Sequence, residues 1–367
     1  MFRVQGCTCR HDPLQCIIPP HMLRVLSIRA GGEVAKMARS LLDQSEKFRE
    51  SRSEDAGTVM VPGKALPGAF VAAAMSAPAG LHDLHREIYD GENKAALPGK
   101  PVRSEGSPAT GDAAVDAAYD NAKIVFDLYS DEFNRNSLDG KGLPLKATVH
   151  HRRDFNNAFW NGSQMVYGDG DGVIFRNFLE LSVVAHEMSH GVVGFSGGLT
   201  YQGQSGALNE SFADVFGALA VQRNIGQSAH EADWLIGKGI LGPGINGAAL
   251  RSMRAPGTAY SDGQLGQDPQ PYHMDLFVNT SEDNGGVHIN SGIPNHAFYL
   301  FSVLLGGNAW GAPGHIWYAA LQSLNNPFAS FADWAAETME AATGLYGVRS
   351  LEFVFLRRAW KLVGISV

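Results

Sequence analysis

The stretch from Val183 to Val193 constrains this chain more than any other, because it carries the pattern His-Glu-x-x-His among small apolar residues. His186 and His190 are four positions apart, so on a helix both imidazoles project from one face, one turn apart, and can reach a single metal ion. Glu187 points to the side, where it can act on a water molecule without being a ligand. A core helix that carries two histidines by chance is the alternative interpretation of these five residues.

Two histidines need a further partner, because a catalytic zinc ion commonly has three protein ligands and one open position. Glu210 is the best candidate. It lies 20 residues after His190 (210 − 190), in a stretch with helical periodicity that follows a glycine-containing turn. Asp214 follows one turn later on the same face, where its carboxylate can accept the free ring N–H of a ligating histidine. Alone, Glu210 would be assigned to a solvated helix surface; with two histidines, the ligand count favours a metal ligand.

This ligand set predicts a hydrolytic site. Zinc held in this way lowers the pKa of its water molecule and polarises a carbonyl group, and Glu187 would take the proton from the water and pass it to the leaving amine. The oxyanion that forms needs further donors. His288, at the start of an expected helix and close in sequence to Asp283, is one candidate, although a structural role fits its position equally well. Tyr201 is a second candidate.

Composition limits the classes of protein that fit. The 367 residues are enough for two lobes and an appendage. The 44% hydrophobic and 18% charged residues are typical of a globular protein. A net charge of -8 and a pI near 5.9 argue against nucleic acid as a partner, since phosphate binding needs a basic surface. The sequence has no apolar run of about 18 residues, so no transmembrane segment is predicted.

All three cysteines, Cys7, Cys9 and Cys16, lie near the N-terminus. A disulfide framework is therefore excluded for the main body of the chain. Cys7 and Cys9 with His11 could bind a metal ion, but a second ligand pair at zinc-finger spacing is missing, so a reduced tail is the simpler interpretation. The first residues also lack the apolar stretch of a signal peptide, so classical export is not indicated.

Apolar spacing and turn residues predict an α+β architecture with a β-rich first lobe, a helical second lobe and the metal helix at their junction. Residues 17–50 are typical of a small helical segment divided at Gly31 and Gly32, and residues 51–79 of an exposed, cleavable linker. Residues 169–172 resemble a metal-binding loop, but a Gly/Asp turn is favoured because the calcium-loop spacing is absent. Strand-and-turn segments are expected at 84–91, 97–103, 145–150, 158–162 and 165–172, and helices at 112–133, 208–224, 290–305, 315–324, 331–343 and 350–363.

Four motifs, taken together in their order and spacing, resemble those of the thermolysin family of zinc endopeptidases. They are Asn157-Ala158-Phe159-Trp160-Asn161-Gly162, His186-Glu187-Met188-Ser189-His190, Asn209-Glu210-Ser211-Phe212-Ala213-Asp214 and Gly285-Gly286-Val287-His288-Ile289-Asn290-Ser291-Gly292. The likeness runs from about His82 to the C-terminus. It implies a two-lobed fold with a β-rich lobe at 80–195, which includes the zinc helix, and a helical lobe at 196–367. It also implies cleavage of peptides on the amino side of bulky hydrophobic residues.

The resemblance implies a role for each matching residue. The zinc ligands would be His186, His190 and Glu210; the general base Glu187; the oxyanion donors His288 and Tyr201, with Asp283 orienting His288. Asp214 and Asn209 would support the ligands. Asn157, the main chain of Ala158 and Arg251 would hold the substrate backbone. Phe175, Phe178, Val183 and Leu250 would line an apolar pocket for the residue after the scissile bond, with a core role equally open for the two phenylalanines.

The N-terminal part is similar to the short Pro-Pro propeptide of the protealysin-like branch, at Pro19, Pro20 and Leu23. This implies that residues 1–70 form a removable inhibitory segment, whose proline-rich turn lies near the cleft and resists cleavage because proline has no N–H and a fixed φ. The chain would then be a precursor with its own propeptide as a partner, cleaved between about Ala56 and Ala79. In an alternative, a thiolate of Cys7, Cys9 or Cys16 caps the zinc ion.

The chain departs from the resemblance where thermolysin-like enzymes carry a double calcium site. Ser182, Val221, Leu235 and Lys238 stand where acidic residues are needed, so this calcium cluster is expected to be absent. The resemblance implies a monomer that acts outside the cell, with a cytoplasmic location as the alternative because no export signal is recognisable. A zinc-stabilised interaction protein without catalysis is the rival function, and the presence of Glu187, Tyr201 and His288 argues against it.

Overall fold

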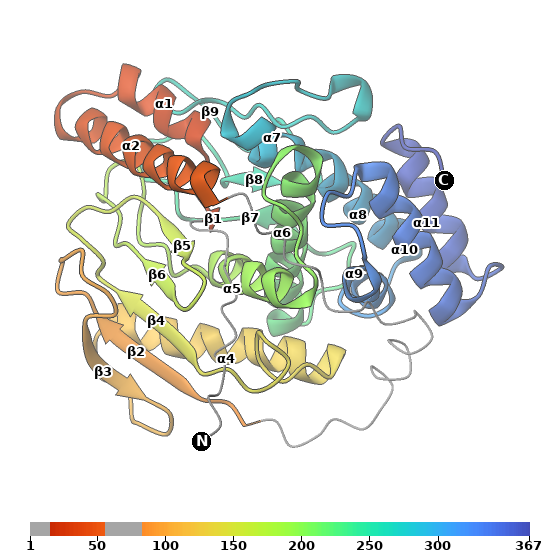
Figure 1. The fold of residues 1–367 in the computed structure, drawn as a ribbon, viewed down its shortest axis with the longest axis horizontal. Coiled ribbons are helices and arrows are strands. Elements are labelled where there is room, and N and C mark those ends of the chain that lie inside the picture. Colours follow the sequence, from red (N-terminus) through yellow and green to blue (C-terminus); the bar gives the residue numbers. More distant parts are fainter. Residues whose placement is uncertain (1–14, 56–82) are drawn as a thin grey trace.

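The computed structural model describes residues 15–55 and 83–367, which form a sheet-containing lobe, a helical lobe and an N-terminal helical hairpin (Figure 1). The main sheet has six strands in the order β1-β5-β6-β4-β2-β3. The strands are β1 (Gln15–Cys16), β5 (Ala158–Trp160), β6 (Met165–Tyr167), β4 (Leu145–Val149), β2 (Arg86–Asp90) and β3 (Lys100–Ser104). Strands β4 and β2, and β4 and β6, are parallel, whereas β1 pairs antiparallel with β5.

Helix α4 (Ala113–Phe133) packs against this sheet (Figure 1). It begins where the Asp112 side chain accepts hydrogen bonds from the backbone N–H groups of Ala114 and Val115, which would otherwise have no partner in the first turn. Its apolar face joins the core through Tyr129, whose ring stacks on Phe216 at a centroid distance of 5.1 Å. The amphipathic pattern expected at 112–133 is therefore confirmed.

Two helices, α5 (Leu181–Ser196) and α6 (Gly203–Ile225), cross the centre of the molecule side by side (Figure 1). Both are buried over most of their length, which suits their small and apolar residues. Gly197, with φ +138°, ends α5, and Gly226, with φ +68°, ends α6, each in a conformation that glycine adopts at little cost. Helix α6 begins earlier than the expected 208, because the preceding glycine-containing turn forms its first turn.

The C-terminal lobe consists mainly of helices (Figure 1). They are α7 (Asp283–Asn290), α8 (Gly292–Leu305), α9 (Ala312–Ser323), α10 (Phe331–Tyr346) and α11 (Leu351–Leu362), with a short 3-10 helix, η1 (Met274–Leu276). Trp317 stacks on Trp360 at 5.6 Å and thereby ties α9 to α11. Two small two-stranded sheets, β7 (Leu235–Ile236) with β8 (Arg251–Ser252) and β9 (Ser261–Asp262) with β10 (Gly266–Gln267), lie in the connection before these helices.

The N-terminal hairpin consists of α1 (Pro20–Arg29) and α2 (Gly32–Asp55), which lie side by side next to the rest of the fold (Figure 1). The turn between the helices includes Gly31, and α2 begins at Gly32, with φ +56°, as expected from the two glycines. The expected linker starts too early, since residues 51–55 belong to α2; the helix continues because this part holds charged and polar helix formers without Gly or Pro. The remainder of that linker lies outside the described residues.

The expected α+β fold, with a β-containing first lobe and a helical second lobe, is confirmed. The helix expected at 290–305 corresponds to α8, which begins at Gly292 because Asn290 is the last residue of α7. Within the first turn of α7, Asn284, Gly285 and Gly286 have positive φ. The loop at 169–172 is a turn: Asp171 Oδ1 accepts the backbone N–H groups of Val173, Ile174 and Phe175. Within the described residues, no helix is both long and apolar enough to cross a membrane.

Candidate active site

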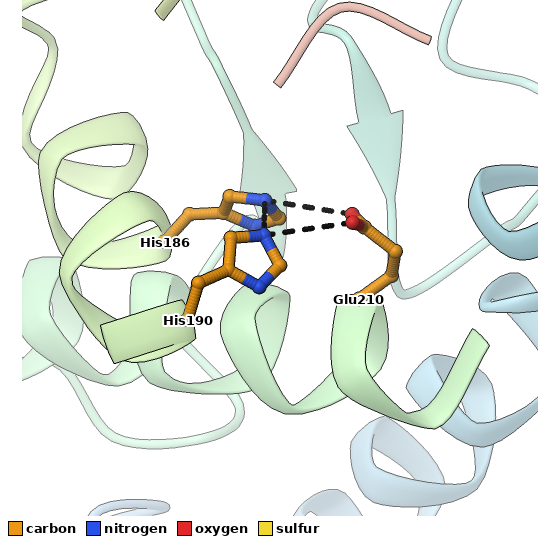
Figure 2. Close-up of side chains that lie close together, drawn as sticks. All are labelled: His186, His190 and Glu210. Atoms are coloured by element: carbon orange, nitrogen blue, oxygen red, sulfur yellow. Dashed lines mark hydrogen bonds and ion pairs between the residues drawn. The ribbon is translucent and has the colours of Figure 1, made fainter. Parts of the chain in front are cut away.

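Helix α5 presents two histidines to helix α6 (Figure 2). His186 and His190 are buried, and their Nε2 atoms lie 3.0 Å apart. The spacing of four residues brings both rings to one face of the helix, as the sequence predicts. The first condition for a shared metal ion is therefore met by the geometry.

Glu210 comes from α6 and points at both imidazoles (Figure 2). Its Oε2 lies 3.5 Å from His186 Nε2, and its Oε1 lies 3.5 Å from His190 Nε2. Candidate ligand atoms of the three residues all lie within 4.8 Å of one another. Among the described residues, this is the one group of three or more such side chains close enough to share an ion.

The protonation of the two histidines fits a metal ion between them. His186 Nδ1 lies 2.8 Å from Asp214 Oδ1, and His190 Nδ1 lies 2.8 Å from Asn209 Oδ1, so each Nδ1 donates to an acceptor and each Nε2 is the ring nitrogen that can bind a metal ion. Burial lowers the pKa of His190 to about 3, which keeps this ring neutral. The two Nε2 atoms face Glu210, whose buried Oε2 has no hydrogen-bond partner. A cation between these atoms would stabilise the arrangement. Imidazole and carboxylate ligands in this number suit zinc.

Asp214 links the metal centre to a second network. It accepts two hydrogen bonds from Arg251, at 2.8 and 2.7 Å, and one from Asn295 Nδ2, at 2.9 Å. Burial alone would raise the pKa of Asp214, but the charge of Arg251 and the bond from His186 hold it below the ordinary value. The carboxylate therefore stays ionised and fixes both the imidazole and the guanidinium.

Glu187 follows His186 in α5 and is buried beside the metal centre. Its Oε2 accepts the backbone N–H of Trp160 at 3.0 Å, and its Oε1 is buried without a hydrogen-bond partner. Burial and the nearby charge of Glu210 raise the pKa of Glu187 well above its ordinary value. One oxygen is thus fixed by strand β5 while the other remains available, as a proton acceptor requires.

His288, Tyr201 and Asp283 form a group of hydrogen-bonding side chains next to Glu210. His288 Nδ1 donates to Asp283 Oδ1 at 2.7 Å, and its Nε2 lies 3.3 Å from the Tyr201 hydroxyl. The Tyr201 hydroxyl donates to Glu210 Oε1. Although burial opposes it, the charges of Asp283 and Glu210 raise the pKa of His288 to about 9, so this ring carries a proton on both nitrogens. The positive φ of Asp283 and the next three residues turns the carboxylate back onto the ring.

The space between these groups holds a segment of the chain itself. Cys16 pairs with Phe159 of β5, and the backbone N–H of Ile17 donates to the Ala158 carbonyl at 3.2 Å. The backbone N–H of Ile18 donates to Asn157 Oδ1 at 3.1 Å. An extended peptide has therefore been added to the edge of the sheet, next to the metal centre.

Two side chains of the site hold the same segment from the other side. His288 Nε2 donates to the Cys16 carbonyl at 3.0 Å, and Arg251 Nη1 donates to the Ile17 carbonyl at 3.1 Å. Asn157, Ala158 and Arg251, which the sequence assigned to the substrate backbone, thus all contact a peptide backbone. The segment in contact is the extended stretch before Pro19, rather than the proline-rich turn itself.

The proposed pocket residues Phe175, Phe178, Val183 and Leu250 are all buried. Phe175 and Phe178 pack on each other with ring centroids 5.8 Å apart. Val183 belongs to α5, and Leu250 directly precedes β8. Of the calcium-site positions, Lys238 pairs with Asp233 at 2.7 Å, and Ser182 Oγ accepts the Gly237 N–H at 2.9 Å.

Of the three cysteines that could cap the zinc ion in the alternative hypothesis, the structure describes only Cys16. Cys16 contacts His288 of the site, but the group of candidate ligand atoms among the described residues does not include its sulfur. Its carbonyl oxygen accepts a hydrogen bond from His288 Nε2. Cys7, Cys9 and the cleavage region 56–79 lie outside the described residues.

Known protein families match both lobes that supply these residues. A family model described as thermolysin metallopeptidase, catalytic domain, matches residues 78–194, and one described as thermolysin metallopeptidase, alpha-helical domain, matches residues 197–365. The chain belongs to the thermolysin family of metallopeptidases. The predicted family and the predicted enzyme class, a metalloendopeptidase, are thereby confirmed, and the family's zinc suits the His-His-Glu group.

Relatives of this thermolysin-family chain include a protein named extracellular metalloprotease from Pectobacterium carotovorum subsp. carotovorum, 51% identical over 285 residues, with 77% of this chain and 82% of the relative covered. Protease PrtS from Photorhabdus sp. (strain Az29) is 49% identical over 290 residues, with 77% of each covered. A solved structure, the precursor of protealysin, a metalloproteinase from Serratia proteamaculans, is similar with a TM-score of 0.83 and 44% identity. It covers 96% of this chain and 100% of its own, so the likeness includes residues before those matched by the family models.

Three supporting residues were missed by the sequence analysis. Trp160 acts through its main-chain N–H, Asn295 through its bond to Asp214, and Gln270 through a bond from its Nε2 to the His288 carbonyl at 2.8 Å. Neither Asn295 nor Gln270 stands at a spacing that points to chemistry. Trp160 belongs to one of the four motifs, but its indole gives no sign that the backbone is the functional part.

Proposed function

We propose that this chain is a zinc endopeptidase that cleaves on the amino side of bulky hydrophobic residues and is made as an autoinhibited precursor. The observation that supports this most strongly is the segment Cys16–Ile18, which lies extended along β5 with its carbonyls held by His288 and Arg251. Those are the contacts that a peptide substrate would need beside the metal centre. A zinc-stabilised interaction protein would have no use for a proton acceptor and two candidate oxyanion donors beside the metal centre.

In this proposal His186, His190 and Glu210 hold the zinc ion, with Asp214 and Asn209 fixing the rings. Bound zinc supplies a Lewis acid that polarises the scissile carbonyl and acidifies water. Glu187 accepts a proton from the attacking water, aided by its raised pKa, and delivers it to the leaving amine. His288, protonated and held by Asp283, and Tyr201 donate to the oxygen on which negative charge develops.

The proposed specificity rests on Ile17, whose side chain is 0% exposed in the position that follows the carbonyl held by His288. The buried apolar side chains of Phe175, Phe178, Val183 and Leu250 are proposed to line its pocket. A β-branched or bulky apolar residue gains about 1.5–3 kcal/mol by such burial, whereas a charged residue would be desolvated without a partner.

The proposed inhibitory segment is residues 1–70, followed by catalytic lobes at 80–195 and 196–367. Pro19 and Pro20 start α1 at a point where a missing N–H costs nothing, and Leu23 is buried beside them. The solved protealysin precursor, similar over 96% of the chain, supports a precursor role. We further propose a monomer whose substrates are peptides or proteins.

Two further parts of the proposal concern calcium and location. The double calcium site would be absent, because the Lys238 ammonium is paired with Asp233 in that region and Val221 and Leu235 offer no side-chain oxygen. The mature protein would act outside the cell, a view supported by the relative named extracellular metalloprotease.

The test is hydrolysis of a mixed peptide library by the mature chain, with and without chelator. Chelator-sensitive cleavage before Leu, Ile, Val and Phe is expected. Glu187→Ala should lower turnover by about 10²–10⁴-fold while the zinc content stays unchanged. Full turnover in this variant, or cleavage without preference for apolar residues, would contradict the proposal.

A further inference from the structure

We propose that the Cys16–Ile17 peptide bond is held as a scissile bond and is the first bond that the precursor cuts, and that residues from Ile17 onward stay in the cleft after the cut. This inference rests on the proposed function and adds an autoproteolytic site. The N-terminal segment is then a slowly cleaved substrate of the enzyme and not only an inhibitor that blocks the site. The argument depends on the register of three residues against β5.

The register places each atom of this bond opposite a group that could act on it. The Cys16 carbonyl accepts from His288 Nε2 at 3.0 Å, with Tyr201 next to that nitrogen. The main-chain N–H of Ile17, the amine that hydrolysis would release, donates to the Ala158 carbonyl and also faces the Glu187 carboxylate. A donor at the carbonyl and an acid–base group at the leaving nitrogen are the two requirements for peptide hydrolysis.

The contacts after the bond fix this register. Arg251 Nη1 binds the Ile17 carbonyl and Asn157 Oδ1 binds the Ile18 N–H, so the two residues following the bond are held by one side chain each. A slip by one residue would place Ile18 at the buried position of Ile17 and move every side chain to the opposite face. Since Pro19 has no N–H, that slip would also remove the donor to Asn157.

The step is a plain hydrolysis. The oxygen of a water molecule forms a bond to the carbonyl carbon of Cys16 as the C–N bond to Ile17 breaks. One proton of the water passes to the Ile17 nitrogen by way of Glu187. The products are a carboxylic acid at Cys16, which ionises by releasing the second proton of the water to solvent, and an amino group at Ile17, with no change of oxidation state and no further reactant.

The cut leaves the larger product in place, because contacts beyond Ile18 anchor it. His21 Nε2 lies 3.1 Å from the Tyr260 hydroxyl, and Arg24 forms an ion pair with Glu282. The apolar side chains of Ile18, Met22, Leu23 and Leu26 are buried in the core. The segment from Ile17 onward therefore stays beside the metal centre at high effective concentration, because it is still part of the same chain, and this slows exchange with other substrates.

The test follows the full chain, loaded with zinc, over time. Samples are stopped with chelator, denatured and measured by intact-mass spectrometry, while a Leu-containing peptide is assayed in parallel with the mature enzyme. A species that begins at Ile17 is expected before any later cut, and Glu187→Ala should not form it. Release of the residues before Ile17 should raise activity on the peptide by less than about twofold, because the anchored product still fills the cleft.

Matched variants distinguish the effect of the backbone register from effects of the Cys16 thiol and of weaker docking of the segment. Cys16→Ser should still be cut before Ile17, and Ile17→Leu should be cut at the same place. Ile17→Asp should be cut there at least about tenfold more slowly, because a carboxylate enters an apolar pocket. A tenfold loss in Cys16→Ser would overturn the proposal in favour of a role for the sulfur.

A measurement without turnover checks the same register. In the Glu187→Ala precursor, hydrogen exchange should protect the Ile17 and Ile18 amides, and Ile17→Asp in that background should reduce the protection. Fast exchange at both amides, or a first cut at any other bond, would overturn the proposal. If the external peptide is cleaved and the Cys16–Ile17 bond stays whole, this inference fails and the proposed function stands; if neither is cleaved, both fail.

Discussion

The metal centre and the segment in the cleft are held by different kinds of contact. At the metal centre, side chains from α5 and α6 are fixed by buried charges, with Asp214 between His186 and Arg251. The segment Cys16–Ile18 is held mainly through its backbone, by the edge of β5 and by donors to its carbonyls. The first region therefore depends on which residues are present, whereas the second accepts any extended chain with an apolar residue at one position.

From this contrast we expect that the loss of one ligand of the metal centre lowers zinc affinity and activity more than any other change considered below. Glu210→Ala removes a carboxylate that lies 3.5 Å from both imidazoles, so zinc affinity should fall by at least about 100-fold and peptidase activity with it. Asn209→Ala, which removes only the bond to His190 Nδ1, should cost about tenfold. Zinc titration against a competing chelator measures both affinities. Equal affinities in the two variants would contradict the assignment of Glu210 as a ligand and Asn209 as a residue that only orients His190.

The buried charge network should dominate stability in the same region. Asp214→Ala leaves the Arg251 guanidinium buried and unpaired, so the free energy of unfolding should fall by about 3–5 kcal/mol. The exposed pair Lys238–Asp233 provides the control, and Asp233→Ala should cost less than about 1 kcal/mol. Urea denaturation of the Glu187→Ala background, which avoids self-digestion, measures both values. Similar losses in the two variants would contradict the account of Asp214.

Docking of the N-terminal hairpin should depend on pH through His21. Burial lowers the pKa of His21 from 6.5 to about 4. The negative charge of Asp283 acts against this shift, whereas the positive charges of His288, Arg251 and Arg24 lower the pKa further. The docked state therefore binds its proton less readily, so docking is strongest above pH 6.5 and weakens by up to about tenfold per pH unit as the pH falls from 6.5 towards 4.

Exchange of the Ile18 amide in Glu187→Ala, followed from pH 7 to 4 and corrected for intrinsic exchange rates, measures this dependence. His21→Phe should reduce the slope, since Phe cannot take up a proton. A slope that is the same in both proteins would assign the pH dependence to another group.

The smallest effect is expected at the surface of the hairpin. Arg24 and Glu282 are partly exposed, at 31% and 59% of their side-chain surface, so Arg24→Ala should weaken docking by less than about 1 kcal/mol, or about fivefold. Ile18→Ala, which removes a buried side chain, should cost several times more. Protection of the Ile17 amide compares the two variants, and a larger effect of Arg24 would show that charge rather than backbone pairing holds the segment.

The same contrast explains what the sequence could predict. Side-chain chemistry leaves a pattern, so the spacing of His186 and His190, the position of Glu210 and the amphipathic helix at 112–133 could all be identified before the fold was known. Backbone contacts leave none: nothing in Cys16 and Ile17 indicates a strand that joins β5, and nothing in Trp160 indicates that its N–H holds Glu187. Asn295 and Gln270 were missed because a single amide in a helix or loop has no distinctive spacing. The end of α2 was misplaced because charged residues suit both a helix and a linker.

The central claim is that two imidazoles and one carboxylate bind a single zinc ion while a peptide carbonyl, rather than a thiolate, faces it in the precursor. X-ray absorption at the zinc edge of the intact Glu187→Ala precursor tests this most directly. The account predicts nitrogen and oxygen neighbours at about 2.0–2.2 Å, with the features of two imidazoles. A sulfur neighbour at about 2.3 Å would contradict it and assign the inhibition to a cysteine.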